Sequence, residues 1–126
     1  MIDSGTCCSK QRKFFMALAA RQAQKSTMMH RHGSVLVHDN TVITHGHNYM
    51  FTHMSHQYSV HAEIDALFKA KALYRHLFPE CDLYVCRAGR VDGPLKMSRP
   101  CANCRDEIAK LGVRRVFYSV AGLMTT

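Results

Sequence analysis

The feature that most constrains the fold is a pair of β-branched runs within residues 33–46, GSVLVHDNTVITHG. The two runs are separated by Asp39-Asn40, a dipeptide that suits a tight turn because both residue types tolerate a positive φ. This pattern predicts an antiparallel hairpin. A sheet is therefore expected here, and the rest of the chain has to cover its faces.

Three other segments have the composition and spacing of helices. The first is residues 10–25, which follow Ser9, a residue type that often caps helices. The second is residues 61–77, and the third is residues 100–112, which have Pro at the start and Gly at the end. Apolar side chains at helical spacing predict the buried sides. In the first two helices these side chains are Phe14, Phe15, Leu18, Ala19, Ile64, Leu67, Phe68 and Leu77.

Two short runs, residues 82–87 and 114–120, predict two further strands. The element order is therefore α-β-β-α-β-α-β. Helices that alternate with strands in the second half predict parallel pairing through right-handed crossovers. Because such a sheet is covered on both faces, we predict an α/β fold, a three-layer α/β/α sandwich with a mixed central sheet.

Length and composition indicate one domain, residues 1–126, with enough chain to bury a core. A hydrophobic content of 47% and a charged content of 21% are typical of soluble globular proteins. No apolar run approaches the roughly 20 residues that span a membrane, and the first residues lack the pattern of a secretory signal. We therefore expect an intracellular protein of the cytoplasm or nucleus, with its six cysteines reduced and no membrane partner.

The chain is basic, with 17 Lys and Arg against 9 Asp and Glu, a net charge of +8. Such a surface attracts polyanions, including nucleic acid and nucleotides. The basic residues are spread along the chain rather than gathered in one block, so they do not indicate a disordered tail. The net charge alone does not distinguish a surface that binds polyanions from a basic surface that contacts only solvent.

Cys101 and Cys104 lie three residues apart in SRPCANCR, residues 98–105. This spacing places both on one face of a helix, in its first turn, where the helix dipole favours the thiolate that binds zinc. A lone C-x-x-C also fits a redox pair or two buried cysteines. Two thiolates and one imidazole are three protein ligands, and a zinc ion held by three ligands keeps a fourth position for water, as in catalytic sites.

His61 and Glu63 begin the second predicted helix, in SVHAEIDALF. An ordinary helix start explains Glu63, because acidic residues favour the first turn, but it leaves His61 without a role. Both residues have a role if His61 binds the metal and Glu63 acts as general acid and base on the water. Together the residues form H-x-E…P-C-x-x-C, a signature of zinc-dependent nucleobase deaminases.

The sequence resembles the cytidine deaminase-like superfamily from about Gly33 to Val120, through HAE at 61–63, PCANC at 100–104 and GHN at 46–48. The resemblance implies that Zn²⁺ is the cofactor and that His61, Cys101 and Cys104 bind it. It implies that Glu63 shuttles protons while the exocyclic amine of cytosine or adenine is replaced by water and leaves as ammonia. It also implies that Asn48 contacts the sugar or base of the substrate.

Two departures from the family affect the substrate and the sheet. Arg99 stands where tRNA adenosine deaminases usually have Glu, so we favour cytosine and keep a tRNA-type adenosine deaminase as an alternative. Little chain follows Val120, where members of the family usually continue into a fifth strand and where the polynucleotide deaminases carry a DNA-reading loop. A strand at 114–120 left at the sheet edge would invite association. Either its arginines protect it, or a second copy covers it to form a homo-oligomer, or a short fifth strand forms in another way.

Two segments beside these motifs have candidate substrate contacts. Residues 49–60 are expected to form a loop whose aromatic residues either stack on a base or close the top of the core. These residues are Tyr49, Phe51 and Tyr58. Residues 87–99 carry basic side chains before the predicted zinc ligands, either as a phosphate contact or as a solvated loop. These side chains belong to Arg87, Arg90, Lys96 and Arg99.

The substrate expected from these observations contains cytosine, either in a nucleoside or nucleotide or in single-stranded DNA or RNA. Asn48, Tyr49 and Arg99 are its predicted contacts. A domain in which zinc only stabilises a binding surface is the competing interpretation. Such a domain would need a fourth protein ligand from Cys7, Cys8 or the histidines at 45, 47, 53 and 56. We interpret these four histidines as surface residues. The competing interpretation also gives Glu63 no role.

Overall fold

The predicted hairpin lies inside a mixed sheet. In the computed structural model, which describes residues 2–5, 9–89 and 95–120, strands β2 (Arg31–His38) and β3 (Thr41–His47) pair antiparallel. Asp39 and Asn40 form the turn, with φ of 49° and 62°. Both lie in the left-handed region, as two-residue turns between twisted strands require. The prediction of a hairpin at this dipeptide is confirmed.

Strand β6 (Cys81–Ala88) pairs antiparallel with β2 and parallel with β8 (Arg115–Tyr118). Strand β1 (Ile2–Gly5) adds to β8 in parallel, which gives the order β1-β8-β6-β2-β3. A two-residue strand, β7 (Leu95–Lys96), pairs with the end of β6. Strand β8 is therefore not at an edge. Of the three ways to protect it, the structure shows the last, a short additional strand.

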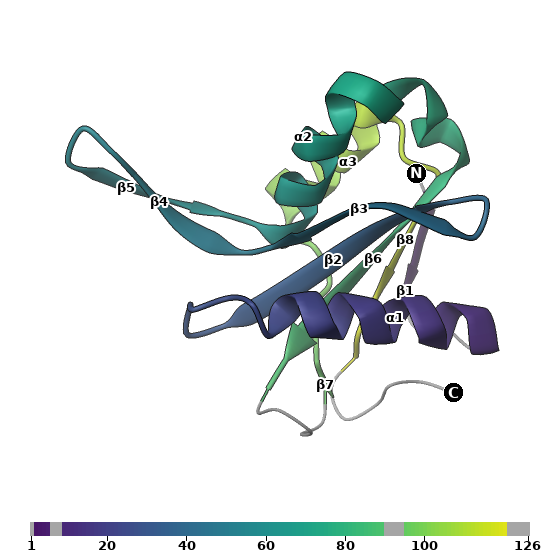
Figure 1. Ribbon diagram of the computed structural model, residues 1–126, viewed down its shortest axis with the longest axis horizontal. Coiled ribbons are helices and arrows are strands. Elements are labelled where there is room, and N and C mark those ends of the chain that lie inside the picture. The colour runs from purple at the N-terminus through teal and green to yellow at the C-terminus, as the bar shows by residue number, and fades with distance from the viewer. Residues whose placement is uncertain (1, 6–8, 90–94, 121–126) are drawn as a thin grey trace.

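Helices cover both faces of this sheet (Figure 1). Helix α1 (Lys10–Ala23) lies on one face, and helices α2 (Ala62–Tyr74) and α3 (Ala102–Leu111) lie on the other. A 3₁₀ helix, η1 (Arg75–Glu80), connects α2 to β6. The predicted three-layer sandwich and the order of its seven predicted elements are confirmed.

The two cores follow the alternation of side chains along the strands. Facing α1 are Val35, Val37, Tyr84, Cys86 and Phe117. Facing α2 and α3 are Leu36, Leu83, Val85 and Val116. Two predicted core residues are wrong: Phe14 is 60% exposed and Phe68 is 55% exposed. Helix α2 lies on the sheet through small residues instead, Ala62, Ala66 and Ala70, because the close approach of its backbone leaves no room for larger ones.

The segment predicted as a loop at residues 49–60 is a second hairpin. Strands β4 (Tyr49–His53) and β5 (His56–Val60) pair with each other in a separate two-stranded sheet, which extends away from the sandwich in Figure 1. Met54 and Ser55 form its turn, with φ of 50° and 71°. Phe51 and Tyr58 are about half exposed, so the alternative in which they close the core is wrong for both.

Across the described ranges of the chain, no helix has the length and apolar character needed to cross a bilayer.

Candidate metal centre and active site

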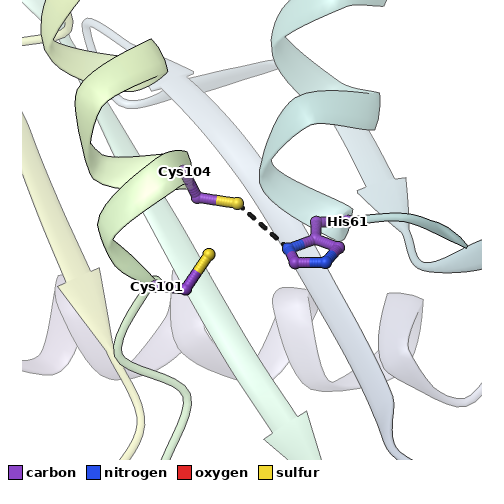
Figure 2. Close-up of side chains that lie close together, drawn as sticks. All are labelled: His61, Cys101 and Cys104. Carbon is purple, nitrogen blue, oxygen red and sulfur yellow. Dashed lines mark hydrogen bonds between the residues drawn. The ribbon is translucent and has the colours of Figure 1, made fainter.

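The structure brings His61, Cys101 and Cys104 together between the N-terminal ends of α2 and α3 (Figure 2). His61 immediately precedes α2, Cys101 immediately precedes α3, and Cys104 lies in the first turn of α3. Their candidate ligand atoms all lie within 4.8 Å of one another, and the Nδ1 atom of His61 is 3.0 Å from the Sγ atom of Cys104. Residues 40 positions apart in the sequence thus converge at one point, as the motifs predicted.

The first turn of α2 is fixed on the sheet by hydrogen bonds and by a close backbone approach. The hydroxyl of Ser34 donates to the carbonyl of Ala62 at 2.7 Å, and the hydroxyl of Thr44 donates to the carbonyl of Ala66 at 3.1 Å. A Cβ atom on Gly46 would lie 2.5 Å from the carbonyl oxygen of Ala62. Only glycine at this position of β3 lets the helix lie this close, and that approach sets the position of His61.

The segment before α3 is held by hydrogen bonds to β6 and to the residue that follows β8. The backbone N–H of Ser98 donates to the carbonyl of Ser119 at 3.0 Å, and the Ser98 hydroxyl donates to the carbonyl of Val85 at 2.7 Å. Pro100 follows two residues later, and Cys101 occupies the N-cap position of the helix without a capping hydrogen bond from its side chain. These contacts fix the residues that lead into the two cysteines, so both sulfur atoms are positioned by the fold rather than by a free loop.

The three side chains fit a zinc ion. Zinc bonds of roughly 2.0–2.3 Å in tetrahedral geometry place imidazole nitrogen and thiolate sulfur atoms about 3.5–4 Å apart, close to the spread of the atoms here. Burial raises the pKa of the Cys104 thiol, and the neighbouring Glu63 carboxylate raises it further. A divalent cation at these atoms offsets both effects, since a coordinating thiol is deprotonated. Among the described residues, this is the one cluster of three or more such side chains.

Glu63 lies in the first turn of α2, next to this cluster, and only 4% of it is exposed. Burial raises the pKa of its carboxyl group, and a backbone hydrogen bond, the charge of His61 and a hydrogen bond with Cys104 partly offset this effect. A carboxyl group that is buried beside candidate metal ligands is poised to exchange a proton rather than to remain a fixed charge.

A cavity of about 330 Å³ opens over these residues. His61, Glu63 and Cys101 form one part of its lining, and Asn48 and Arg99 form another. This volume lies at the small end of the range of ligand sites in proteins, about 300–1,000 Å³. The cavity therefore suits a small ring such as a nucleobase with its sugar, placed next to the metal cluster.

Asn48 is buried in the wall of this cavity and holds the chain that leads into β2. Its side-chain oxygen accepts from the backbone N–H of His32 at 2.9 Å, and its amide nitrogen donates to the carbonyl of His30 at 2.6 Å. Tyr49, by contrast, begins the projecting hairpin and is not part of the cavity lining. The structure thus brings Asn48 and Arg99 to the metal cluster and leaves Tyr49 outside it.

Two histidines of this cavity were not singled out from the sequence, His30 and His32. Burial lowers the pKa of His32 to about 4, and the positive charges of Arg87, His61 and His30 lower it further. The one available signal was the stretch HRH immediately before the first strand of the predicted hairpin. The other predicted thiols, Cys81 and Cys86, are buried in the two cores, and Cys7 and Cys8 lie outside the described residues.

The fold has counterparts among solved structures. A dCMP deaminase from the cyanophage S-TIM5, in complex with dCMP and dUMP, superposes with a TM-score of 0.66 at 20% identity, over 89% of this chain and 82% of that one. A cytidine deaminase from Burkholderia pseudomallei gives 0.58 at 28% identity, over 79% and 75%. A guanine deaminase from Bacillus subtilis gives 0.61 at 23% identity, over 86% and 63%.

No curated protein matches the sequence significantly. Residues 9–120 match the family described as the cytidine and deoxycytidylate deaminase zinc-binding region. This match includes both helix starts that carry the cluster and every strand from β2 to β8. The chain therefore belongs to the family of zinc-binding cytidine and deoxycytidylate deaminases.

Proposed function

We propose that this zinc-dependent hydrolase of the deaminase family acts on cytosine and converts it to uracil. The observation that carries the proposal is the buried Glu63 carboxyl group, which lies beside the His61, Cys101 and Cys104 cluster in the wall of a cavity of nucleobase size. A domain in which zinc only stabilises the fold has no need of such a carboxyl group. An enzyme that moves protons between water and a base requires one.

The proposed chemistry divides between the metal and Glu63. When bound by His61, Cys101 and Cys104, zinc supplies a Lewis acid that lowers the pKa of a water to around 7. Glu63 takes a proton from the attacking water and delivers it to the ring nitrogen. After attack at C4, Glu63 takes the remaining proton from the new hydroxyl group and donates it to the amine, which leaves as ammonia while the C4 carbonyl forms. Its burial keeps these transfers away from bulk water.

We propose that Asn48 and Arg99 contact the substrate, because both line the cavity that contains Glu63. Asn48 keeps one amide hydrogen and one lone pair beyond its two backbone hydrogen bonds, which leaves it able to bind a sugar hydroxyl. Tyr49 begins the projecting hairpin, so it is proposed to contact only those parts of a substrate that extend beyond the cavity.

Cytosine is favoured over adenine because Arg99 occupies the position where adenosine deaminases of this superfamily usually have Glu. The likeness to a cytidine deaminase, at 28% identity, points in the same direction. A tRNA-type adenosine deaminase is the second candidate. An intracellular location also belongs to the proposal, supported by the free thiols of Cys81 and Cys86, which are not candidate zinc ligands.

The decisive experiment is ammonia release by the zinc-loaded protein with cytidine, deoxycytidine 5′-monophosphate, adenosine, guanine and single-stranded oligonucleotides. We expect release from cytosine compounds alone. Release from adenosine or guanine and not from cytosine would overturn the choice of base. If no compound is deaminated although zinc is bound stoichiometrically, the binding-domain interpretation replaces the enzyme.

A polynucleotide substrate has its own test, because contacts between basic side chains and phosphates release counterions. If single-stranded DNA or RNA is the substrate, deamination of an oligonucleotide should fall steeply between low and moderate salt, while deamination of cytidine barely changes. A protein that deaminates cytidine efficiently and ignores the oligonucleotide at low salt acts on the free nucleoside or nucleotide.

A further inference from the structure

A second cavity, of about 220 Å³, lies next to the catalytic one and is basic. The two cavities share Met29 and His30 in their linings, so they adjoin at that point. The second cavity is lined further by Arg31, Arg87 and Lys96. Among the described residues that line it there is no acidic side chain, and the one in the catalytic cavity is Glu63.

The basic side chains of this cavity are held close together by the sheet. In the register of the strands, Arg87 of β6 is the direct partner of His32 of β2 on one side and of Lys96 of β7 on the other. Direct partners on adjacent strands lie on the same face, so Arg87 and Lys96 are like charges side by side. Such a pair is unfavourable unless an anion lies between the two charges or beside them.

Hydrogen bonds fix this arrangement further. The guanidinium of Arg87 donates to the Nδ1 atom of His30 at 2.7 Å, which orients it toward the side shared with the catalytic cavity. Arg31 is committed to the fold, since it donates to the side-chain oxygen of Gln24 at 2.8 Å and to the carbonyl of Gly89. The charge that remains available to a ligand therefore belongs to Arg87 and Lys96. No ion pair involves either of them among the described residues.

The effect of this charge reaches the catalytic cavity. The pKa of His32 is lowered to about 4 by burial first and by the charge of Arg87 second. His32 is thus neutral at pH 7 and adds no charge of its own. The positive potential at the junction of the two cavities comes from Arg87, with Lys96 beside it.

We propose that the cavity lined by His30, Arg87 and Lys96 binds a phosphate group of the substrate while its base occupies the adjoining catalytic cavity. This inference rests on the proposed function and narrows it, because it assigns the enzyme to phosphorylated substrates. Arginine binds phosphate through paired N–H donors, and lysine adds a point charge. The phosphate is either the terminal group of a nucleotide or a phosphodiester of a single strand, and both present the same anionic oxygens.

The test compares deoxycytidine with deoxycytidine 5′-monophosphate in the zinc-loaded protein. The double variant Arg87→Gln/Lys96→Gln removes two positive charges from the cavity, and the control Lys25→Gln/Lys71→Gln removes two from exposed positions outside both cavities. We expect the ratio of kcat/KM for the nucleotide to kcat/KM for the nucleoside to fall about 10- to 100-fold in the first variant. The control should keep the ratio of the original protein. Because a folding defect lowers both values together, the ratio reports phosphate binding alone.

A binding measurement separates failure of this inference from failure of the proposed function. Titration calorimetry with deoxyuridine 5′-monophosphate and with deoxyuridine needs no turnover. If no cytosine compound is deaminated but the monophosphate binds more tightly than deoxyuridine, and Arg87→Gln/Lys96→Gln removes the difference, the phosphate site stands without the proposed reaction. If cytosine is deaminated but neither the kinetic ratio nor the binding difference responds to this variant, the inference is overturned and the reaction stands.

A third arm identifies the source of the phosphate. A single-stranded oligodeoxynucleotide with one central cytosine is assayed beside the nucleotide in both variants. A selective loss of activity on the oligonucleotide in Arg87→Gln/Lys96→Gln supports a phosphodiester in the cavity, and a selective loss on the monophosphate supports a terminal phosphate. Equal activity of the two variants on both substrates contradicts the proposal.

Discussion

Two buried carboxyl groups, Glu63 and Asp82, lie toward opposite ends of the central strand β6, and their surroundings differ sharply. Asp82 lies at the first residues of β6 and is 7% exposed. Glu63 lies at the start of α2 and lines the same cavity as His32, whose strand partner Arg87 is near the other end of β6. Each must offset the cost of burying a charge. The fold provides that offset for Asp82 through neighbouring arginines. Glu63 lies beside the candidate zinc ligands instead.

Asp82 is held by two arginines. Arg114 and Arg115 each donate two hydrogen bonds to its carboxylate, at 2.7–3.1 Å. Burial raises the pKa of Asp82, but the hydrogen bonds from Arg115 and Arg114 outweigh it, so the pKa lies below its usual value. Protection of a sheet edge is one of the three alternatives that the sequence leaves open for these arginines, and in the structure they neutralise this buried acid.

Glu63 has no arginine or lysine partner among its described contacts, and burial raises the pKa of its carboxyl group. The comparison of Asp82 with Glu63 shows how a carboxyl group that stabilises the fold differs from one that is placed for catalysis. A carboxylate with cationic partners supplied by the fold is fixed in one protonation state, whereas one placed beside candidate metal ligands is free to change its state during a reaction.

The largest expected effect comes from removing a predicted zinc ligand. Cys104→Ala should lose bound zinc and lower deamination on the order of ten-thousandfold or more, because both the Lewis acid and the activated water depend on the metal. Metal analysis and ammonia release measure the two losses. Cys81→Ser, at a buried thiol in the core, is the control and should keep its zinc. Stoichiometric zinc in Cys104→Ala would refute the predicted ligand set.

The next effect separates the two carboxyl groups by activity. Glu63→Gln should retain zinc and fold while deamination falls about a hundredfold to ten-thousandfold, since the amide cannot transfer the proton. Asp82→Asn is the matched control, an equally small change at the other buried acid, and should keep kcat/KM within about twofold of the original. Near-normal activity in Glu63→Gln would assign proton transfer to another group.

The same pair of variants separates the two groups by stability. Asp82→Asn should lower the free energy of unfolding by about 2 kcal/mol, because it leaves two arginines without their partner. Glu63→Gln should change it by less than about 1 kcal/mol, or raise it, since a buried charge without a cationic partner is removed. Urea denaturation measures both values. A larger loss for Glu63→Gln than for Asp82→Asn would reverse the comparison.

The two hairpins show which parts of the fold the sequence could predict. Both have turn residues with positive φ, but Asp39 and Asn40 are typical of such turns, whereas Met54 and Ser55 are not. The first hairpin also alternates between two cores, while the second is exposed on both faces and has no buried pattern to detect. The sequence of the second hairpin therefore predicts a loop.

The metal cluster was predictable because its residues lie at helix starts, where local sequence fixes geometry. The residues around the cluster are harder to predict from the sequence. The row of His32, Arg87 and Lys96 depends on the register of three strands, and β7 contributes only two residues to it. Likewise, Phe68 was expected in the core, but Gly46 brings the α2 backbone so close to β3 that alanines fill the contact.

The smallest expected effect is the pH dependence of stability that Asp82 contributes. Its pKa in the folded protein lies below the value of about 3.9 in an unfolded chain, so the unfolded state binds its proton first as pH falls. Its stabilising contribution is therefore complete above about pH 5 and is lost progressively as pH drops through the folded pKa. Asp82→Asn has no such proton to bind. The difference in the free energy of unfolding between the original protein and Asp82→Asn should thus be constant from pH 7 to 5 and shrink below pH 4.

Urea denaturation at pH 7, 5, 4 and 3 measures this difference. A difference that stays constant down to pH 3 would mean that the two arginines do not depend on the charge of Asp82, and the contrast with Glu63 would then rest on activity alone.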